Sequence, residues 1–430
     1  MTNTKIYKNG LKLVVQSMEN FESVSFNMFV KTGSINEAEG YYGISHFIEH
    51  MLFKGTSSRS SLEISKELDS IGANVNAYTD KEETVYYTKS TAENLEKCVE
   101  ILSDMLFNSV FDKKEMAREK KVVIEEIKMY DDDASSKAEL LVNQAFYAGN
   151  AFSRDVAGTI QSVKNLTQQK IYAYMQKFYV PANITLSFAG NVDFETAQCF
   201  VEKYFLPYFI EKGEEVNNHL EIQNGINVQK SYKDNAQSQV CISFSGVQRG
   251  SEDLYVAKIF DVSFGLGMSS ILFQRIREKL GLVYNISSST IANCAGGDLT
   301  IHFATTTKNV PLALSAIAEE IEKVKQNGIS VEQFENARNN LISSIKLSFE
   351  NTSFVSLFNA KNFAYLGKII TKQQYIENVK KVKQSELLPY LSKTFSNSKY
   401  AISYVGDNTR INLNKYFVLK WQNLSKLQKY

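Results

Sequence analysis

The feature that most restricts the fold of this chain is a long internal repeat. Residues 23–26, Ser-Val-Ser-Phe, return in similar form at residues 240–244, Val-Cys-Ile-Ser-Phe. Residues 177–191 return as residues 394–407, and both pairs are about 215 residues apart, too far for a solenoid repeat. Two unrelated α+β halves could share one strand–glycine–helix ending, but a common offset at two places favours two copies of one fold.

Residues 210–225 separate the two copies. This segment has few large apolar residues and contains Glu, Asn and Gly, a composition typical of an exposed linker. We therefore predict a first half at residues 1–209, a linker at 210–225 and a second half at 226–430. Early segments of the first half alternate like strands, whereas residues 92–107 and 112–130 follow a helical period, so we expect α+β structure.

Composition excludes several classes of protein. Of the 430 residues, 43% are hydrophobic and 22% are charged, which is typical of a globular chain. The formal net charge of +1 offers no basic surface, so we expect neither a nucleic-acid partner nor a membrane partner. No signal peptide or membrane-spanning segment is visible, which predicts a cytoplasmic location. The four cysteines are scattered without a CxxC pair and are expected to be small buried residues.

Two of the only four histidines lie within five residues, in the sequence His46-Phe-Ile-Glu49-His50. We predict a helix here, and residues four apart on a helix project from the same face about one turn apart. Imidazole nitrogen is a good zinc ligand, and a catalytic zinc site takes three protein ligands and leaves a position for water. Glu49 lies on the flank of this face, where its carboxylate can take a proton from water without binding the metal.

Two other interpretations of this motif stay open on the residues alone. The histidines could be ordinary core residues beside a surface glutamate, although such a string is rare by chance in a chain with few histidines. A closed structural zinc site is also compatible with the motif. Such sites favour thiolate ligands, however, and no cysteine is close in sequence.

A third ligand has to come from elsewhere in the chain. The predicted helix at 112–130 offers four acidic residues, Glu115, Glu119, Glu125 and Glu126. Glu119 and Glu126 are seven residues apart, so they share one face of the helix, two turns from each other. One of them could bind zinc while the other supports a ligating histidine, but solvated acidic residues would have the same spacing.

Several stretches together resemble one family of enzymes. The order His-x-x-Glu-His, with the glutamate directly before the second histidine, is that of the inverzincins. The chain resembles this zinc metallopeptidase family, which includes pitrilysin, insulin-degrading enzyme and mitochondrial processing peptidase, and in particular its short bacterial members. The resemblance covers essentially the whole chain, with the clearest matches at residues 43–56, 72–79, 119–126 and 272–284.

The resemblance implies a zinc site in the first half. It makes His46, His50 and Glu126 the ligands of one zinc ion per chain. It makes Glu49 the general base, and Glu119 the acid that supports the ligands.

The resemblance also implies residues that act on the substrate. Asn76 and Ala77 match a pair that holds the substrate backbone on an edge strand, whereas Arg277 and Tyr284 match catalytic residues that stabilise the oxyanion. Without the family, Asn76 and Ala77 would simply lie on a strand after a turn. Arg277 would belong to a solvated charge cluster, and Tyr284 would be a strand aromatic.

Finally, the resemblance implies a fold and an activity. Each half would be an antiparallel sheet covered by helices, and the two halves would form one side of a clamshell. Because the zinc motif and the Arg277/Tyr284 pair are both present, we expect a homodimer that closes a chamber. The expected function is zinc-dependent endopeptidase cleavage of extended peptides or unfolded segments by Glu-assisted attack of a metal-bound water. The alternative is a catalytically silent scaffold or peptide-binding subunit of the same fold.

Overall fold

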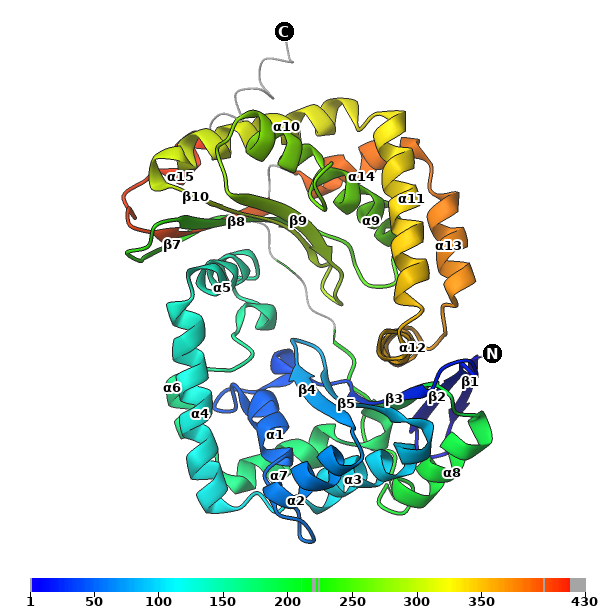
Figure 1. The fold of residues 1–430 in the computed structure, drawn as a ribbon. Helices are drawn as coiled ribbons and strands as arrows, with labels where there is room; N and C mark the ends of the chain where they lie inside the picture. Colours follow the sequence, from blue (N-terminus) through cyan, green and yellow to red (C-terminus); the bar gives the residue numbers. More distant parts are fainter. Residues whose placement is uncertain (1, 210, 219–221, 223–224, 397–398, 418–430) are drawn as a thin grey trace. The chain divides into compact units, whose positions relative to one another are not determined.

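The computed structural model describes the chain except for residues 1, 210, 219–221, 223–224, 397–398 and 418–430 (Figure 1). Part of the predicted linker at 210–225 and the end of the predicted second half therefore lie outside the described residues. The chain forms two compact units that are both discontinuous in sequence. The first unit comprises Met1–Lys128, Arg154–Asn217 and Lys346–Lys372, and the second comprises Met129–Ser153, Asn218–Ile345 and Gln373–Tyr430.

The first unit is built on a six-stranded, mostly antiparallel sheet. The order across this sheet is β1 (Thr2–Ile6), β2 (Lys12–Ser17), β6 (Ile184–Gly190), β3 (Ser23–Val30), β5 (Thr84–Thr91) and β4 (Asn74–Thr79). β2 and β6 run parallel, and the other neighbours run antiparallel. Since side chains alternate along a strand, Phe26 and Met28 enter the main core while Phe29 packs on the opposite face.

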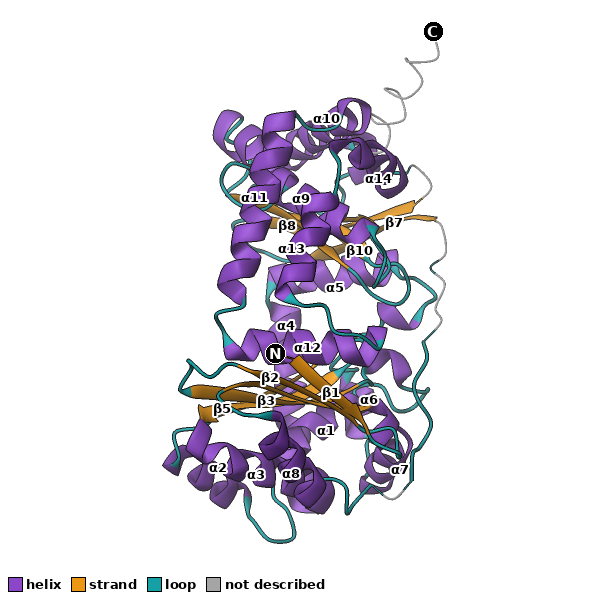
Figure 2. Ribbon diagram, turned by 90° about the vertical axis from the view of Figure 1, so that its right-hand side faces the viewer, coloured by secondary structure: helices purple, strands orange, loops and turns teal. Residues whose placement is uncertain are grey.

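Helices cover both faces of the first sheet (Figures 1 and 2). α1, α3 and α8 contact strands around the main core, whereas α12 contacts β2, β3 and β6 from the opposite face. The helices of this unit are α1 (Ile44–Leu52), α2 (Ser61–Ser70), α3 (Leu95–Asn108), α4 (Lys113–Asp132), α6 (Ile160–Lys164), α7 (Gln168–Phe178), α8 (Phe194–Tyr204) and α12 (Thr352–Leu366). The helices predicted at 92–107 and 112–130 correspond to α3 and α4.

The second unit repeats this plan with five strands. Their order is β7 (Gly225–Tyr232), β11 (Lys399–Gly406), β8 (Ser238–Ser245), β10 (Asp298–Thr305) and β9 (Asn285–Ile291), with β7 and β11 parallel and the other neighbours antiparallel. α5 contacts β7, β8 and β11. The helices are α5 (Ala134–Phe146), α9 (Asp253–Phe264), α10 (Val310–Asn327), α11 (Val331–Ser348), α13 (Lys372–Lys381), α14 (Leu387–Thr394) and α15 (Leu413–Tyr416).

The repeated sequences occupy equivalent places in the two sheets. Residues 177–191 include β6, which lies between β2 and β3, and residues 394–407 include β11, which lies between β7 and β8. The α+β fold predicted for each half is confirmed, with one parallel strand pair in each otherwise antiparallel sheet. The units exchange one helix each, because α12 of the first unit lies between β10 and β11 in sequence, and α5 of the second unit precedes the linker. The domain bounds 1–209 and 226–430 stay a prediction.

Two further expectations concern burial. Among the described residues, none of the helices has the length and apolar character needed to cross a bilayer. Cys98 and Cys241 are buried as expected, but the expectation is wrong for Cys199, which is exposed, and for Cys294, which is only half-buried. On α8 the buried face is taken by Ala197 and Val201, and Cys199, two residues from each, projects to the other side.

Candidate metal centre

Helix α1 presents the histidine motif on its less apolar side. The apolar residues of the helix, Ile44, Phe47, Ile48, Met51 and Leu52, are all buried, and they leave the motif's polar side chains half-buried. The helix begins at Gly43, whose φ of 85° lies in the left-handed region. There the Glu37 carboxylate accepts hydrogen bonds from the backbone N–H groups of Gly43 (2.7 Å) and Ser45 (2.9 Å), so it fixes the start of the helix.

Helix α4 brings two carboxylates to the histidines. Glu119 Oε1 lies 2.8 Å from His50 Nδ1, and Glu119 Oε2 lies 2.8 Å from the Lys54 ammonium. Two turns along the same face, Glu126 Oε2 lies 3.7 Å from His46 Nε2 and 3.5 Å from His50 Nε2. The spacing of seven residues thus gives the two acids different partners on α1.

Three ligand atoms converge on one point. The Nε2 atoms of His46 and His50 are 3.2 Å apart, and Glu126 Oε2 completes the triangle. In the described part of the chain, this is the one group of three or more His, Cys, Asp or Glu side chains whose ligand atoms all lie within 4.8 Å. With zinc bonds of about 2.0–2.1 Å and tetrahedral angles, two ligand atoms would be roughly 3.4 Å apart. The donor set therefore fits a zinc ion.

The two histidines differ in their affinity for protons. Burial, reinforced by the neighbouring His50, lowers the pKa of His46. Burial alone would also lower the pKa of His50, but hydrogen bonds with Glu119 and Glu126 raise it to about 9. The hydrogen bond from His50 is the main cause that lowers the pKa of Glu126, which keeps this carboxylate ionised. His46 is thus held neutral and Glu126 anionic, the forms in which each side chain binds a metal.

Glu49 stands beside this group without belonging to it. Its Oε2 accepts a hydrogen bond of 2.6 Å from the Thr79 hydroxyl at the end of β4. Burial raises the pKa of the Glu49 carboxyl, although the hydrogen bond from Thr79 opposes this shift. A carboxylate with a raised pKa next to a metal site is suited to proton transfer near neutral pH.

Comparison with known proteins places the chain in a family. Residues 12–160 match the family model described as Insulinase (Peptidase family M16), and residues 165–341 match the model of the Peptidase M16 inactive domain. The uncharacterized zinc protease YmxG of Bacillus subtilis (strain 168) is 32% identical over 93% of this chain and 96% of its own length. The chain belongs to peptidase family M16. An uncharacterized zinc protease of Rickettsia bellii is also 32% identical, over 92% of this M16 chain and 95% of its own.

Solved structures share the fold of this M16 chain. A protease from Helicobacter pylori has a TM-score of 0.88 at 20% identity, covering 94% of this chain and 99% of its own. A chain of complex III2 from Candida albicans has a TM-score of 0.83 at 16% identity, and the match covers 96% of this chain and 98% of that one. The resemblance predicted from the sequence is confirmed at the level of family and fold.

The predicted substrate-backbone pair of the M16 chain lies on β4. This strand is at the edge of the described first sheet, where it pairs with β5 on one side, and α1 contacts it. Asn76 is exposed, and its Oδ1 accepts a hydrogen bond of 2.8 Å from the backbone N–H of Ala77. Thr79, the partner of Glu49, lies at the end of the same strand.

The predicted catalytic pair lies in the second unit. Arg277 belongs to the helical turn Phe273–Lys279, and its guanidinium carbon lies 4.5 Å from the centre of the Phe273 ring. The same carbon lies 6.0 Å from the centre of the Tyr284 ring, and the Tyr284 side chain is 70% exposed. The structure therefore brings Arg277 and Tyr284 together. The His46, His50 and Glu126 group lies in the first unit.

Three residues around the metal centre were missed by sequence reasoning. Lys54 follows His50 by four residues, in the turn just after α1 ends at Leu52, so its closeness in sequence is the one signal that could have found this partner of Glu119. Thr79 and Glu37 give no such signal. They reach α1 from a strand and a turn, and a contact between separate elements leaves no periodic pattern in the sequence.

Proposed function

We propose that this M16 chain is a zinc-dependent endopeptidase that cleaves peptides or unfolded segments bound in extended form. The observation that carries the proposal is the triangle of ligand atoms from His46, His50 and Glu126. Its sides of 3.2, 3.5 and 3.7 Å suit one zinc ion per chain. Glu49, a half-buried carboxylate outside this ligand triangle, lies next to it. Relatives named zinc proteases support the same class of activity.

In this mechanism His46, His50 and Glu126 would hold the zinc ion, which when bound would supply Lewis acidity toward a peptide carbonyl and toward water. Glu49 takes the proton of the attacking water and delivers it to the leaving nitrogen. Thr79 holds the Glu49 carboxylate in place through its hydroxyl. Glu119 accepts the Nδ1–H of His50, which orients this ring so that its Nε2 is available to the metal.

The substrate would pair with β4 as an added strand. Backbone hydrogen bonds at Asn76 and Ala77 are largely indifferent to side chains, which suits a peptidase acting on varied extended segments. Arg277 and Tyr284 would donate hydrogen bonds to the oxyanion that forms at the scissile carbonyl. We further propose that two copies of the chain associate to close a chamber. Light scattering coupled to size-exclusion chromatography should give a dimer, and a stable monomer at micromolar concentration would contradict this.

A catalytically silent subunit is the alternative. The structural likeness to a chain of complex III2 favours it, because that neighbour is part of a multi-chain complex. The presence of a full set of metal-binding side chains together with Glu49 argues for the enzyme, since a scaffold has no need of a general base.

Cleavage-site mapping separates these possibilities. We expect mass spectrometry of a peptide mixture to detect cleavage by the zinc-loaded chain and none after chelation. Glu49→Gln should lower the rate by about 10²- to 10⁴-fold with zinc content still near one per chain, because the proton acceptor is lost while the ligands stay. Cleavage by Glu49→Gln at the wild-type rate would refute the assigned base, and a wild-type chain that binds zinc without cleaving any peptide would favour the silent subunit.

A further inference from the structure

A second polar site lies inside the second unit, apart from the metal centre. A cavity of about 250 Å³ separates part of α5 from strands β8, β9 and β10. Helix α5 contributes Glu139 and Asn143 to its wall, and β10 contributes Asp298, Thr300 and His302. A cavity of this size can hold a small molecule or one side chain.

Alternation along β10 explains why this wall is polar. Asp298, Thr300 and His302 point to the cavity, whereas the intervening residues Leu299, Ile301 and Phe303 are fully buried on the other face. The strand register adds hydroxyls at the same level, because Thr300 is paired with Ser289 on β9 and with Ser243 on β8. The space under α5 is thus lined by polar groups where a helix usually meets an apolar sheet face.

The equivalent helix–sheet contact in the first unit is packed differently. There α12 also lies on a polar sheet face, but its hydroxyls bond the sheet directly. Ser25 Oγ lies 3.0 Å from the Thr352 hydroxyl, and the Ser187 and Ser356 hydroxyls each donate to the other's carbonyl at 2.8 Å. In the second unit Ser403 donates to the Ala138 carbonyl (2.6 Å), which seats α5 while the neighbouring cavity stays open.

Two acceptors from α5 lack partners in the described part of the chain. Asn143 Oδ1 is buried with no hydrogen-bond donor near it, and the Glu139 carboxylate makes neither an ion pair nor a hydrogen bond there. Burial raises the pKa of Glu139, and the charge of Asp133 adds to this shift. Glu139 is exposed, so water can hydrate its carboxylate, but the buried Asn143 Oδ1 is costly without a partner. This cavity is therefore suited to a ligand that brings donors.

The charges around the cavity are mainly negative. Asp298 accepts hydrogen bonds from the hydroxyls of Tyr147 (2.7 Å) and Thr300 (2.8 Å), and burial raises its pKa. Lys399 is the cation that acts on Asp298, and burial lowers its pKa to about 8. His302 adds no positive charge, because burial lowers its pKa. Negative groups therefore outnumber cations, which favours a positively charged ligand.

The geometry favours an organic cation over a metal ion. Among the described residues, the acidic and histidine side chains of this cavity do not bring three ligand atoms within 4.8 Å of one another. Ammonium and guanidinium groups carry several N–H donors that are spread over a larger volume than a metal ion. They therefore match acceptors that lie on both α5 and β10.

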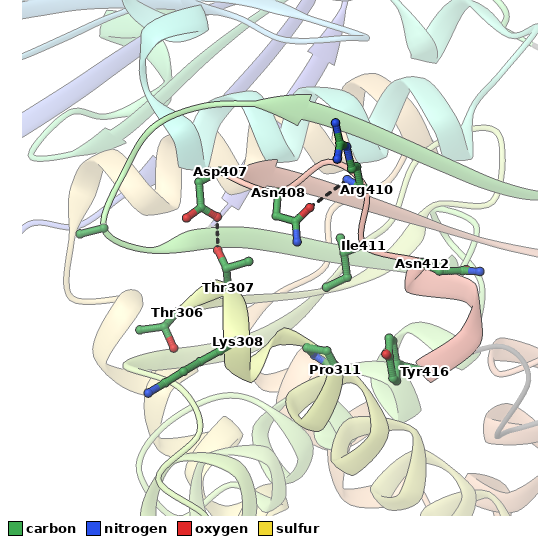
Figure 3. Close-up of a pocket in the computed structure, with 11 residues that line it drawn as sticks. Thr306, Thr307, Lys308, Pro311, Asp407, Asn408, Arg410, Ile411, Asn412 and Tyr416 are labelled. Carbon is green, nitrogen blue, oxygen red and sulfur yellow. Dashed lines mark hydrogen bonds between the residues drawn. The ribbon is translucent and has the colours of Figure 1, made fainter.

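The wider pocket in Figure 3 gives no comparable signal. There Thr307 donates to Asp407, and Asn408 Oδ1 accepts from the backbone N–H of Arg410 (3.1 Å). The side chains of Lys308 and Arg410 are exposed. The acceptors Asp407 and Asn408 Oδ1 in that pocket already receive hydrogen bonds from neighbouring groups.

We propose that the cavity under α5 binds an ammonium or guanidinium group, with Glu139 as its counter-ion and Asn143 Oδ1 and Asp298 as further acceptors. The group can belong to a small free cation or to a lysine or arginine side chain of a peptide. This site does not depend on the zinc-dependent activity proposed above, because none of the residues that line the cavity is a proposed zinc ligand, catalytic residue or substrate-backbone residue of that activity.

Isothermal titration with butylguanidinium tests the proposal, with butylurea as its neutral counterpart of the same shape. The protein is the full chain in the presence of a chelator, so that the metal centre cannot contribute. We expect butylguanidinium to bind and butylurea to bind at least about tenfold more weakly. Equal binding of the two compounds, or no binding of either at millimolar concentration, would overturn the proposal.

Variants locate the site. Glu139→Gln should weaken butylguanidinium binding about tenfold or more, whereas Glu332→Gln, an exposed residue on α11, should leave it unchanged. Asn143→Leu removes the second acceptor and should also weaken butylguanidinium binding. This variant tests the site if Glu139→Gln fails to fold. Unchanged affinity in folded Glu139→Gln or Asn143→Leu would refute the assignment. A blocked Ala-Arg-Ala peptide, compared with Ala-citrulline-Ala, then identifies the source: binding of the arginine form alone indicates a peptide side chain, and binding of neither indicates a free cation.

Discussion

At the scale of single residues, His50 contacts both carboxylates that helix α4 brings to α1, Glu119 and Glu126. Its Nδ1 is 2.8 Å from Glu119, and its Nε2 is 3.5 Å from Glu126. A hydrogen bond at one ring nitrogen fixes which nitrogen is left for a metal. Glu119 thus fixes the tautomer of His50, and Glu126 completes the proposed ligand set.

Metal binding should release about one proton per chain near pH 7. The pKa of His50 is raised to about 9, so below that pH its ring is protonated in the metal-free protein and has to lose this proton before it binds zinc. The pKa of His46 is lowered, so it contributes no proton. Zinc affinity should therefore fall as pH decreases below about 9. Calorimetric titration with zinc in buffers of different ionisation enthalpy measures the number of protons released per zinc bound. A value near zero would contradict the assignment of His50 as a protonated ligand.

Adjacent glutamates on α4 provide a matched pair of variants. Glu126→Gln should weaken zinc binding by more than about 100-fold, since even a lost supporting partner costs roughly 10- to 100-fold. Glu125→Gln should leave it unchanged, because Glu125 is exposed and pairs with Lys128 (2.7 Å). Competition with a chelating dye measures both affinities. Equal losses in the two variants would mean that Glu126 is no ligand.

At the scale of elements, the position of α1 depends on a close backbone contact at its start. A Cβ atom at Gly43 would lie 2.4 Å from the Ala157 carbonyl oxygen, and the φ of 85° already disfavours any other residue. Glu37 caps the same turn from outside the helix. The helix that carries His46 and His50, the proposed zinc ligands, is therefore anchored at its start by a tightly packed junction.

Gly43→Ala should lower the free energy of unfolding by about 3 kcal/mol, because left-handed strain and a steric clash act together. Gly72→Ala is the control. Its φ of 63° gives similar strain, but a Cβ there meets nothing within 4 Å, so we expect a loss of only about 1 kcal/mol. Urea unfolding followed by circular dichroism measures both. A loss at Gly43 no greater than that at Gly72 would show that the contact with Ala157 is relieved at little cost.

At the scale of the whole molecule, the exchanged helices make the two halves of the sequence interdependent. Phe29 and Val85 on the first sheet are covered by Ala360 and Ala364 of α12, which comes from the other half of the chain. Helix α5 likewise lies on the second sheet although it precedes the linker. Neither half contains all the elements of a compact unit.

Cutting the chain between residues 217 and 218 tests this interdependence. Residues 1–217 alone lack α12, so an apolar and hydroxyl-rich sheet face would be exposed, and we expect aggregation or loss of cooperative unfolding. Co-expressed with residues 218–430, the same fragment should be recovered as a folded complex. A tag on residues 218–430 tests whether residues 1–217 co-purify with them. Thermal unfolding of residues 1–217 alone tests whether that fragment folds without α12. A fragment 1–217 that unfolds cooperatively like the full chain would refute the interdependence.

The sequence by itself determined the features that repeat over short distances. A helical period places His46 and His50 on one face of α1, and it places Glu119 and Glu126 on one face of α4, whatever the rest of the fold does. The two copies of the strand pattern likewise determined that there would be two similar sheets. Periodicity could not decide which of the two acids, Glu119 or Glu126, would be the metal ligand, because both lie on the same face.

Only the tertiary structure decided which elements meet. It brought Glu126 to both histidines and Glu119 to His50 and Lys54, it aligned Thr79 with Glu49, and it placed α5 and α12 on sheets far from them in sequence. The polar cavity under α5 also arises there, since strands β8, β9 and β10 come together only in the folded sheet. Contacts between distant segments depend on packing of the whole chain, and packing has no local period that a sequence could display.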